Sequence, residues 1–130
     1  MIALDTNVLV RYLAQDDDAQ LQSVLKLLSK KKATFYLLDL VLVECAWVLQ
    51  SLYDWSPAEV ADAYARLTSI HNLVFEDEAR LRASLKALRG GADLADEMIA
   101  RKCRDEGCQQ LATFDSGLVK RHGPFAVKPF

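Results

Sequence analysis

The sequence predicts an α/β fold in which helices cover both faces of a mainly parallel sheet. Short apolar runs alternate with segments of helical periodicity along the chain, the order that produces parallel sheets. Aspartates follow directly after two of these runs, at Asp5 and Asp115, and parallel sheets bind ligands beyond the carboxyl ends of their strands. A chain of 130 residues suits one domain rather than two, so we expect a single domain over residues 1–130.

The first half of the chain shows clear helix signals between short apolar strands. In order, we expect a strand at 2–4, a helix up to 13, a helix from 16–18 onward, a strand at 34–38, and helices at 40–53 and 57–68. In the second helix, leucine and valine recur at helical spacing, and three lysines at 30–32 suit its negative C-terminal end. Ser56 to Glu59 form a capping box with Pro57 at the first helical position, which marks where the last of these helices begins.

The second half of the chain repeats this alternation. In order, we expect a strand at 72–75, helices at 77–89 and 93–106, a strand at 110–114, a short helix at 116–121, and a last strand at 125–127. Leu81, Leu85 and Leu88 share one face of the first helix. The pair Gly90-Gly91 breaks the chain, and Gly107 is placed to terminate the second helix.

The composition gives no overall attraction to nucleic acid, because the net charge is −2. A protein that binds RNA would need its cations gathered locally, near the phosphates that they neutralise. Three basic clusters are candidates, although such clusters are more often solvated helix ends: Lys30–Lys32, Arg101–Lys102–Arg104 and Lys120–Arg121–His122.

Nothing in the sequence indicates export or membrane insertion. The apolar start lacks a preceding basic segment and is interrupted by Asp5, and the apolar residues 37–52 include Asp39 and Glu44. The three scattered cysteines fit small apolar residues in a reducing cytosol better than a disulfide framework. We therefore expect a cytoplasmic protein.

Asp5 and Asp115 each stand just past an expected strand and just before an expected helix. Either can be a catalytic or metal-binding carboxylate at the sheet edge, or an ordinary helix cap. Glu44 is a sharper anomaly, because it is the only polar residue from Leu40 to Leu49. A helix that apolar should be largely buried, and its carboxylate then needs a cation, either an Arg or Lys partner or a divalent ion.

Asp93 and Asp96 lie three residues apart, on one face of an expected first helical turn. Acidic residues there are also typical of a well-capped helix. Asp96 lies at the edge of an apolar stripe formed by Ala95, Met98, Ile99 and Cys103, which directs it toward the interior margin.

Together these carboxylates occupy positions that can converge over the carboxyl edge of a parallel sheet. Carboxylates packed together repel one another, and a hard divalent cation with oxygen ligands such as magnesium removes that conflict. Such a centre suits hydrolysis of phosphate esters. Other chemistries have little support, because the sequence lacks a zinc motif, a glycine-rich phosphate loop and a nucleophile elbow.

At these positions the sequence resembles the PIN-domain ribonucleases, and among them the VapC-type toxins of bacterial toxin–antitoxin pairs. The resemblance covers essentially the whole chain. It is carried by Ile2-Ala3-Leu4-Asp5-Thr6-Asn7-Val8-Leu9, by Val43 to Leu49 around Glu44, by Gly91 to Ala100 around Asp96, and by Thr113-Phe114-Asp115. Two departures are Asp39, where relatives usually carry a small hydroxyl residue or proline, and Leu94, which replaces a common aromatic residue.

The resemblance implies a three-layer α/β/α sandwich on a mainly parallel sheet of four or five strands, with endoribonuclease activity that depends on Mg²⁺ or Mn²⁺. It assigns the catalytic and metal-binding quartet to Asp5, Glu44, Asp96 and Asp115. Asp93 would be an auxiliary carboxylate, and Thr6, Asn7 and Thr113 would orient carboxylates or water, although Asn7 can instead cap a helix. It also implies a homodimer and a cognate VapB-like antitoxin.

Two other functions stay open at this point. A catalytically silent domain would only bind RNA or a protein, but all four acidic positions are present. A phosphatase with Asp5 as its nucleophile usually needs a second acid two residues on, where this chain has Asn7. For the endoribonuclease, Arg11 and Lys120 are basic residues that would position the RNA backbone.

Overall fold

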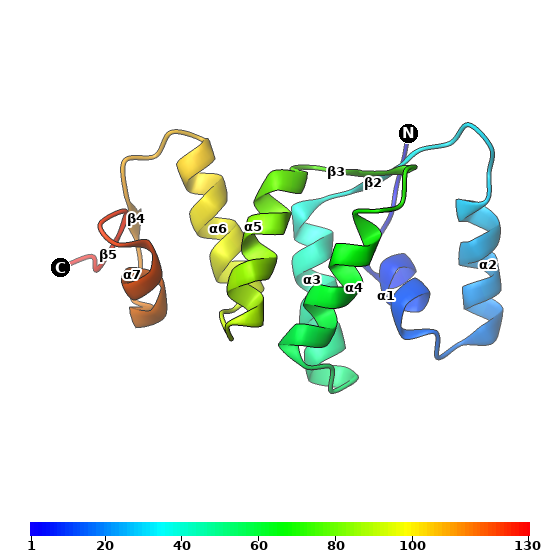
Figure 1. The fold of residues 1–130 in the computed structure, drawn as a ribbon, viewed down its shortest axis with the longest axis horizontal. Helices are drawn as coiled ribbons and strands as arrows, with labels where there is room; N and C mark the ends of the chain where they lie inside the picture. Colours follow the sequence, from blue (N-terminus) through cyan, green and yellow to red (C-terminus); the bar gives the residue numbers. More distant parts are fainter. The chain divides into compact units, whose positions relative to one another are not determined.

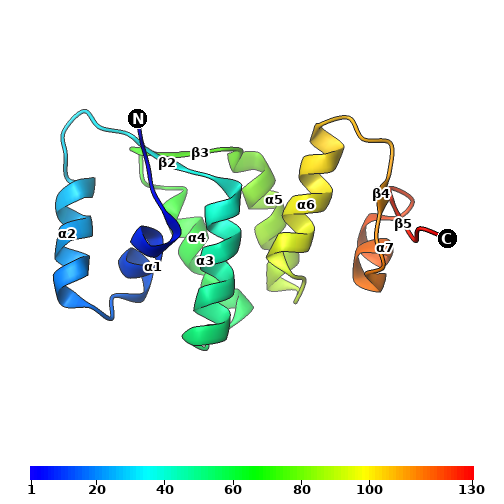
Figure 2. The ribbon, with the colours of Figure 1, turned by 180° about the vertical axis from the view of Figure 1, so that it is seen from behind.

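The structure is a computed structural model that describes residues 1–130. It contains seven helices and five strands and forms two compact units, residues 1–78 and residues 79–130. Figures 1 and 2 show the ribbon from opposite sides. No helix has both the length and the apolar character that crossing a bilayer requires.

The first unit contains a three-stranded sheet and four helices (Figure 1). Its elements are β1 (Ile2–Ala3), α1 (Thr6–Ala14), α2 (Asp18–Leu28), β2 (Phe35–Leu37), α3 (Asp39–Leu52), α4 (Pro57–Leu67) and β3 (Leu73–Phe75). The strand order is β1-β2-β3, and both pairings are parallel, with Phe35 opposite Ile2 on one side and Leu73 on the other. Helix α3 packs against α1 and α4.

The core of this unit takes buried residues from β2, α3 and α4. Phe35, Leu42 and Tyr64 are completely buried. The Tyr64 hydroxyl donates a hydrogen bond of 2.6 Å to the carbonyl oxygen of Leu42, which satisfies a buried polar group and ties α4 to α3. Helix α4 begins with the expected capping box, in which Ser56 and Glu59 exchange side-chain-to-backbone hydrogen bonds.

The second unit contains two strands and three helices. Its elements are α5 (Glu78–Arg89, whose first residue belongs to the first unit), α6 (Leu94–Asp105), β4 (Leu111–Ala112), α7 (Ser116–His122) and β5 (Ala126–Val127). Strands β4 and β5 pair in parallel, with Leu111 opposite Ala126. Gly107 follows Glu106, the C-cap of α6, and has a φ of 85°, a left-handed conformation that favours glycine and ends the helix as expected.

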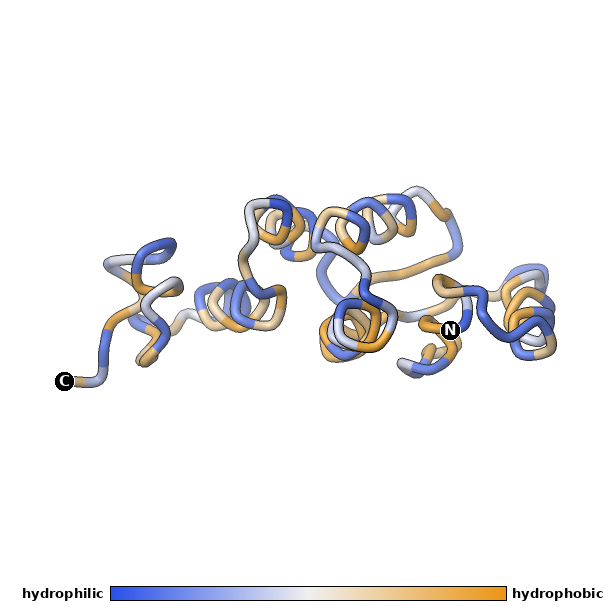
Figure 3. The backbone as a smooth tube through the Cα atoms, turned by 90° about the horizontal axis from the view of Figure 1, so that it is seen from below, coloured by the Kyte–Doolittle hydropathy of each residue, from blue (hydrophilic) through white to orange (hydrophobic).

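These elements confirm the α/β class and every strand and helix that the sequence predicts, in the predicted order. The structure pairs the five parallel strands as a sheet of three and a sheet of two. Figure 3 colours the backbone by hydropathy, and the helices seen nearly end-on carry hydrophobic residues on some sides and hydrophilic residues on others. This is the amphipathic pattern of helices that cover a core.

The burial expected for α3 is wrong on one face. Leu40 and Trp47 are 65% and 66% exposed, and Glu44, which lies on the same face at helical spacing, is exposed as well. The opposite face carries Leu42, Cys45 and Leu49, which are buried. Glu44 is therefore not the buried carboxylate that the sequence predicted. The prediction failed because a helix that is apolar all round has no polar face to show which side is exposed.

Candidate active site

Asp5 occupies the turn from β1 into α1. Its extended backbone ends the strand, and its side chain accepts a hydrogen bond of 2.8 Å from the backbone N–H of Thr6. Asp5 is therefore the N-cap of α1, one of the two roles that the sequence left open. A carboxylate has two oxygens and several lone pairs, so this single bond leaves Asp5 able to accept from other groups or bind a cation.

Thr6 connects the start of α1 to Glu44 on α3. Its side chain is buried, and its hydroxyl donates a hydrogen bond of 3.1 Å to Oε2 of Glu44. Asp5 and Glu44 are 39 residues apart in sequence. Both of their carboxylates accept a hydrogen bond from Thr6, one from its backbone N–H and one from its hydroxyl. Asn7 lies inside α1 and is exposed, so the alternative in which Asn7 caps that helix is wrong.

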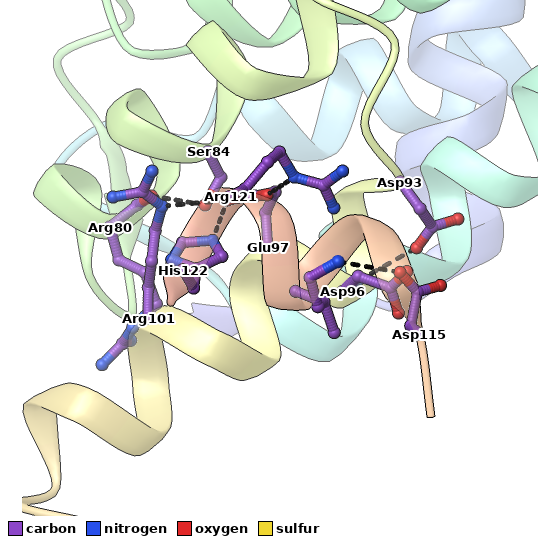
Figure 4. A network of polar contacts seen from close by, with 10 residues as sticks. Arg80, Ser84, Asp93, Asp96, Glu97, Arg101, Asp115, Arg121 and His122 are labelled. Carbon is purple, nitrogen blue, oxygen red and sulfur yellow. Dashed lines mark hydrogen bonds and ion pairs between the residues drawn. The ribbon is translucent and has the colours of Figure 1, made fainter. Parts of the chain in front are cut away.

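Three more of the predicted carboxylates gather in the second unit (Figure 4). Asp93 is the N-cap of α6, and its Oδ1 accepts a hydrogen bond of 3.0 Å from the backbone N–H of Asp96. Asp115 is the N-cap of α7, and its Oδ1 accepts one of 2.8 Å from Leu118. Thr113 positions Asp115, because its hydroxyl oxygen accepts a hydrogen bond of 3.0 Å from the backbone N–H of Asp115.

Asp96 carries the electrostatic cost of this arrangement. Burial raises the pKa of its carboxyl, and the negative charges of Asp93 and Asp115 raise it further, while the positive charge of Arg121 opposes them. Its side chain is half-buried, at the interior margin as the sequence predicted. The stripe expected beside it is partly wrong, because Ile99 is 51% exposed. Glu97, which was not expected in this stripe, is buried instead.

Glu97 is a residue that sequence reasoning did not single out. It is completely buried, and its two oxygens are 2.6 Å from Nε of Arg121 and 2.8 Å from Nε2 of His122. Nε of Arg101 is 3.5 Å away, one helical turn along α6. Burial alone would raise the pKa of Glu97, but the hydrogen bonds and charges of Arg121 and His122 outweigh it, and the pKa is lowered. The sequence signal that could have indicated this residue is the basic cluster at residues 120–122, because Arg121 and His122 bind the buried carboxylate of Glu97.

Arg121 binds Glu97, and its positive charge also acts on Asp96. Figure 4 shows its guanidinium on the side of Glu97 that faces Asp93, Asp96 and Asp115. A Cβ atom placed on Gly117 would lie 2.8 Å from Nη1 of Arg121 and 3.0 Å from Oδ1 of Asp115. The absence of a side chain at residue 117 therefore leaves room for the guanidinium beside the carboxylate.

The donors of this cluster suit a hard divalent cation. Carboxylate oxygens are the ligands that Mg²⁺ and Mn²⁺ prefer. Such an ion would also offset the like charges of Asp93 and Asp115, which raise the pKa of Asp96. The side chains do not yet form a finished ligand set, because no group of three or more His, Cys, Asp or Glu residues is arranged to hold a metal ion. The fit to a metal thus rests on the chemistry of the donors and on their charge.

Comparison with known families decides what kind of domain this is. The model of the PIN domain matches residues 2–123, a range that includes the turn at Asp5, Glu44 and all three carboxylates of the second unit. The chain belongs to the PIN domain family. PIN domains are generally nucleases, and PIN-domain nucleases typically use divalent metal ions. Comparisons with curated proteins and with solved structures found no match.

Family membership confirms the sequence resemblance to PIN domains and the nuclease-type fold that it implied. Within this PIN domain, Arg11 is engaged inside the first unit. Its guanidinium bonds to Gln20, to Tyr53 at 3.0 Å and to Asp16 at 3.2 Å, which leaves the proposed role of Arg11 in holding RNA without structural support.

Asp39, the departure from the relatives' pattern, is buried in the first turn of α3. It is not the helix cap, because Leu38 is the N-cap and makes no side-chain cap bond. Instead Glu76 accepts a hydrogen bond of 3.1 Å from the backbone N–H of Asp39. A residue that follows β3 thus provides the acceptor for the start of α3, a pairing that sequence spacing does not reveal.

Proposed function

We propose that this PIN domain is a metal-dependent endoribonuclease that hydrolyses RNA phosphodiester bonds. The proposal assigns the catalytic and metal-binding roles to Asp5, Glu44, Asp96 and Asp115, with Asp93 as an auxiliary carboxylate. Mg²⁺ is the ion we expect, and Mn²⁺ is the alternative.

The observation that carries the proposal is the surroundings of Asp96. Its carboxylate is half-buried, and this burial together with the negative charges of Asp93 and Asp115 raises its pKa, while the positive charge of Arg121 offsets part of the effect. Perturbed carboxylates of this kind gather at functional sites, where a cation or a substrate completes the charge balance. The PIN family match points to the same chemistry.

The neighbouring hydroxyls would hold the carboxylates in place. The hydroxyl of Thr6 bonds to the carboxylate of Glu44, and that of Thr113 bonds to the backbone N–H of Asp115, which supports the orienting roles that the resemblance implies. Asn7 has no such bond in support and remains assigned by resemblance. A bound divalent ion would supply a more acidic water and neutralise charge on the phosphodiester.

We further propose that the domain is the toxin of a toxin–antitoxin pair, with a VapB-like antitoxin, and that it forms a homodimer in the cytoplasm. Support comes from Leu40 and Trp47, two exposed apolar side chains on one face of α3, since exposed apolar groups gathered on one face can mark an interaction surface. The family match extends over both units, which supports treating residues 1–130 as a single domain.

The test is cleavage of structured and unstructured RNA by the purified protein with Mg²⁺, with Mn²⁺ and with EDTA. Asp5→Asn and Asp96→Asn are the test variants. Asp54→Asn is the matched control, because Asp54 is exposed, its φ of 57° suits asparagine, and it lies outside the proposed site.

Metal-dependent cleavage that is lost in both test variants and kept in the control would support the nuclease. Cleavage that persists in EDTA at an unchanged rate would rule out the metal-dependent mechanism. If calorimetry shows no metal binding and no RNA is cut, the domain is a silent binding module.

A further inference from the structure

An open hollow of about 560 Å³ lies in the second unit, beside α7. It is lined by Arg104, Gln109, Gln110, Arg121, His122, Gly123, Pro124 and Phe125. Its volume is within the range of small-ligand sites, which is about 300–1,000 Å³. The hollow brings together two basic clusters that lie far apart in the sequence, those around Arg104 and Arg121.

The cations of this hollow are held in place by their neighbours. The guanidinium carbon of Arg104 lies 4.6 Å from the ring centroid of Phe125, a cation–π contact. Arg121 is held at Nε by the buried carboxylate of Glu97. A guanidinium held through one nitrogen or stacked on a ring keeps other N–H donors for phosphate oxygens.

The polar groups between them suit a base. Gln109 and Gln110 are exposed, and each amide offers both a donor and an acceptor, the groups that pair with base edges in single-stranded RNA. An unstacked base can also lie against an arginine plane or an aromatic ring. A cation pair with flanking amides and a ring therefore matches a nucleotide better than it matches a simple anion.

Arg121 connects this hollow to the aspartate cluster. It lines the hollow and also stands beside Asp115 at the space over Gly117. We propose that the hollow binds one nucleotide of the single-stranded RNA whose phosphodiester bond water hydrolyses at the carboxylates, with Arg121 as the residue that the two places share. This inference rests on the proposed nuclease function and adds to it the place where the substrate is held.

Nucleotide binding can be measured without cleavage, in EDTA, by NMR titration of the whole protein. The probes are the ribonucleoside 5′-monophosphates, inorganic phosphate and poly-glutamate. We expect a monophosphate to shift the side-chain signals of Gln109, Gln110 and Arg104, with Arg104→Gln weakening its binding on the order of tenfold, the loss expected for one charge-assisted contact. Inorganic phosphate should move the arginine signal alone.

Lys86→Gln is the matched control, because it removes one exposed cation from α5 of the same unit, outside the hollow. Binding weakened equally by both variants would mean non-specific charge attraction and would overturn the proposal. Signals in the hollow that respond to poly-glutamate and not to nucleotides would overturn it as well, and would assign the hollow to an acidic protein partner. Gln110→Ala keeps every charge, so weaker nucleotide binding by this variant would support contact with the base, and unchanged binding would count against it.

Kinetics separates this inference from the proposed function. With an active wild-type protein, Arg104→Gln should raise KM about tenfold and leave kcat nearly unchanged, as expected for lost substrate binding. Equal KM values in Arg104→Gln and Lys86→Gln would overturn the proposal that the hollow binds a nucleotide and would leave the nuclease function unaffected. A protein that binds nucleotides there in EDTA but cuts no RNA would overturn the nuclease and leave the hollow as an RNA-binding site.

Discussion

The hydroxyl of Thr6 donates a hydrogen bond of 3.1 Å to Oε2 of Glu44, which joins the first turn of α1 to the middle of α3. Thr6 is buried and Glu44 is exposed, so a fixed group directs a mobile one. A carboxylate on an exposed helix face would otherwise sample several rotamers. The bond gives Glu44 a defined orientation toward the residue next to Asp5.

Thr6→Val should therefore reduce activity with only a modest loss of stability. The change keeps the shape of the side chain and removes one neutral-to-charged hydrogen bond, which costs about 1.5 kcal/mol or less at a part-exposed acceptor. We expect cleavage to fall about tenfold as Glu44 loses its orientation. Steady-state cleavage and thermal unfolding measure the two effects. Thr6→Ser should restore the rate, and a Val variant as active as wild type would refute the role.

Asp96→Asn should stabilise the protein at neutral pH. The pKa of Asp96 is higher in the folded protein than in an unfolded chain, so its ionised form costs folding free energy above that pKa. As the pH falls through the raised pKa, the carboxyl takes up a proton and the cost disappears. The stability advantage of the variant should therefore shrink in acid. Denaturant unfolding at neutral and acidic pH tests this, with Asp54→Asn as control, and a variant less stable at neutral pH would contradict it.

Glu97→Gln should destabilise the protein. Loss of a buried carboxylate leaves Arg121 and His122 without their shared partner, and breaking such pairs costs about 3 kcal/mol. Because the folded-state pKa of Glu97 is below its ordinary value near 4.5, its contribution is complete above that value and is lost as the pH falls through the lowered pKa.

Denaturant unfolding of Glu97→Gln against pH measures both effects. Glu106→Gln, a change at an exposed position at the end of the same helix, is the control. Equal stability of the two variants at neutral pH would show that the Glu97 cluster does not stabilise the fold.

The thiol of Cys45 should resist alkylation until the protein unfolds. Burial raises its pKa to about 11, and the residue is fully inaccessible. Cys108 is exposed and should react first. Labelling with iodoacetamide followed by peptide mass analysis tests this order, and Cys108→Ser should remove the fast phase. Fast labelling of Cys45 in native protein would show that α3 opens readily.

The order of elements was predictable because the chain marks its helix starts with strong local signals. Asp5, Ser56, Asp93 and Asp115 all cap helices through their own side chains, and such bonds depend only on residues within three positions. The grouping of Asp93 and Asp96 in one helical turn was predictable for the same reason.

What the sequence did not reveal depends on contacts between distant segments. The exposed side of α3 was misjudged because an apolar helix has no polar face to mark its orientation. Glu97 was overlooked because its partners come from α7, 24 and 25 residues later. The hollow beside Arg104 likewise forms only when two basic clusters, each unremarkable alone, come together.

Three of the acidic positions, Asp5, Asp93 and Asp115, both cap a helix and belong to the proposed site. Asparagine caps helices about as well as aspartate but carries no charge. At these positions natural selection for a folded chain and selection for a working enzyme therefore impose different demands. If the proposed assignment holds, a lineage freed from the need to cut nucleic acid can drift from Asp to Asn at all three positions and still inherit an intact fold.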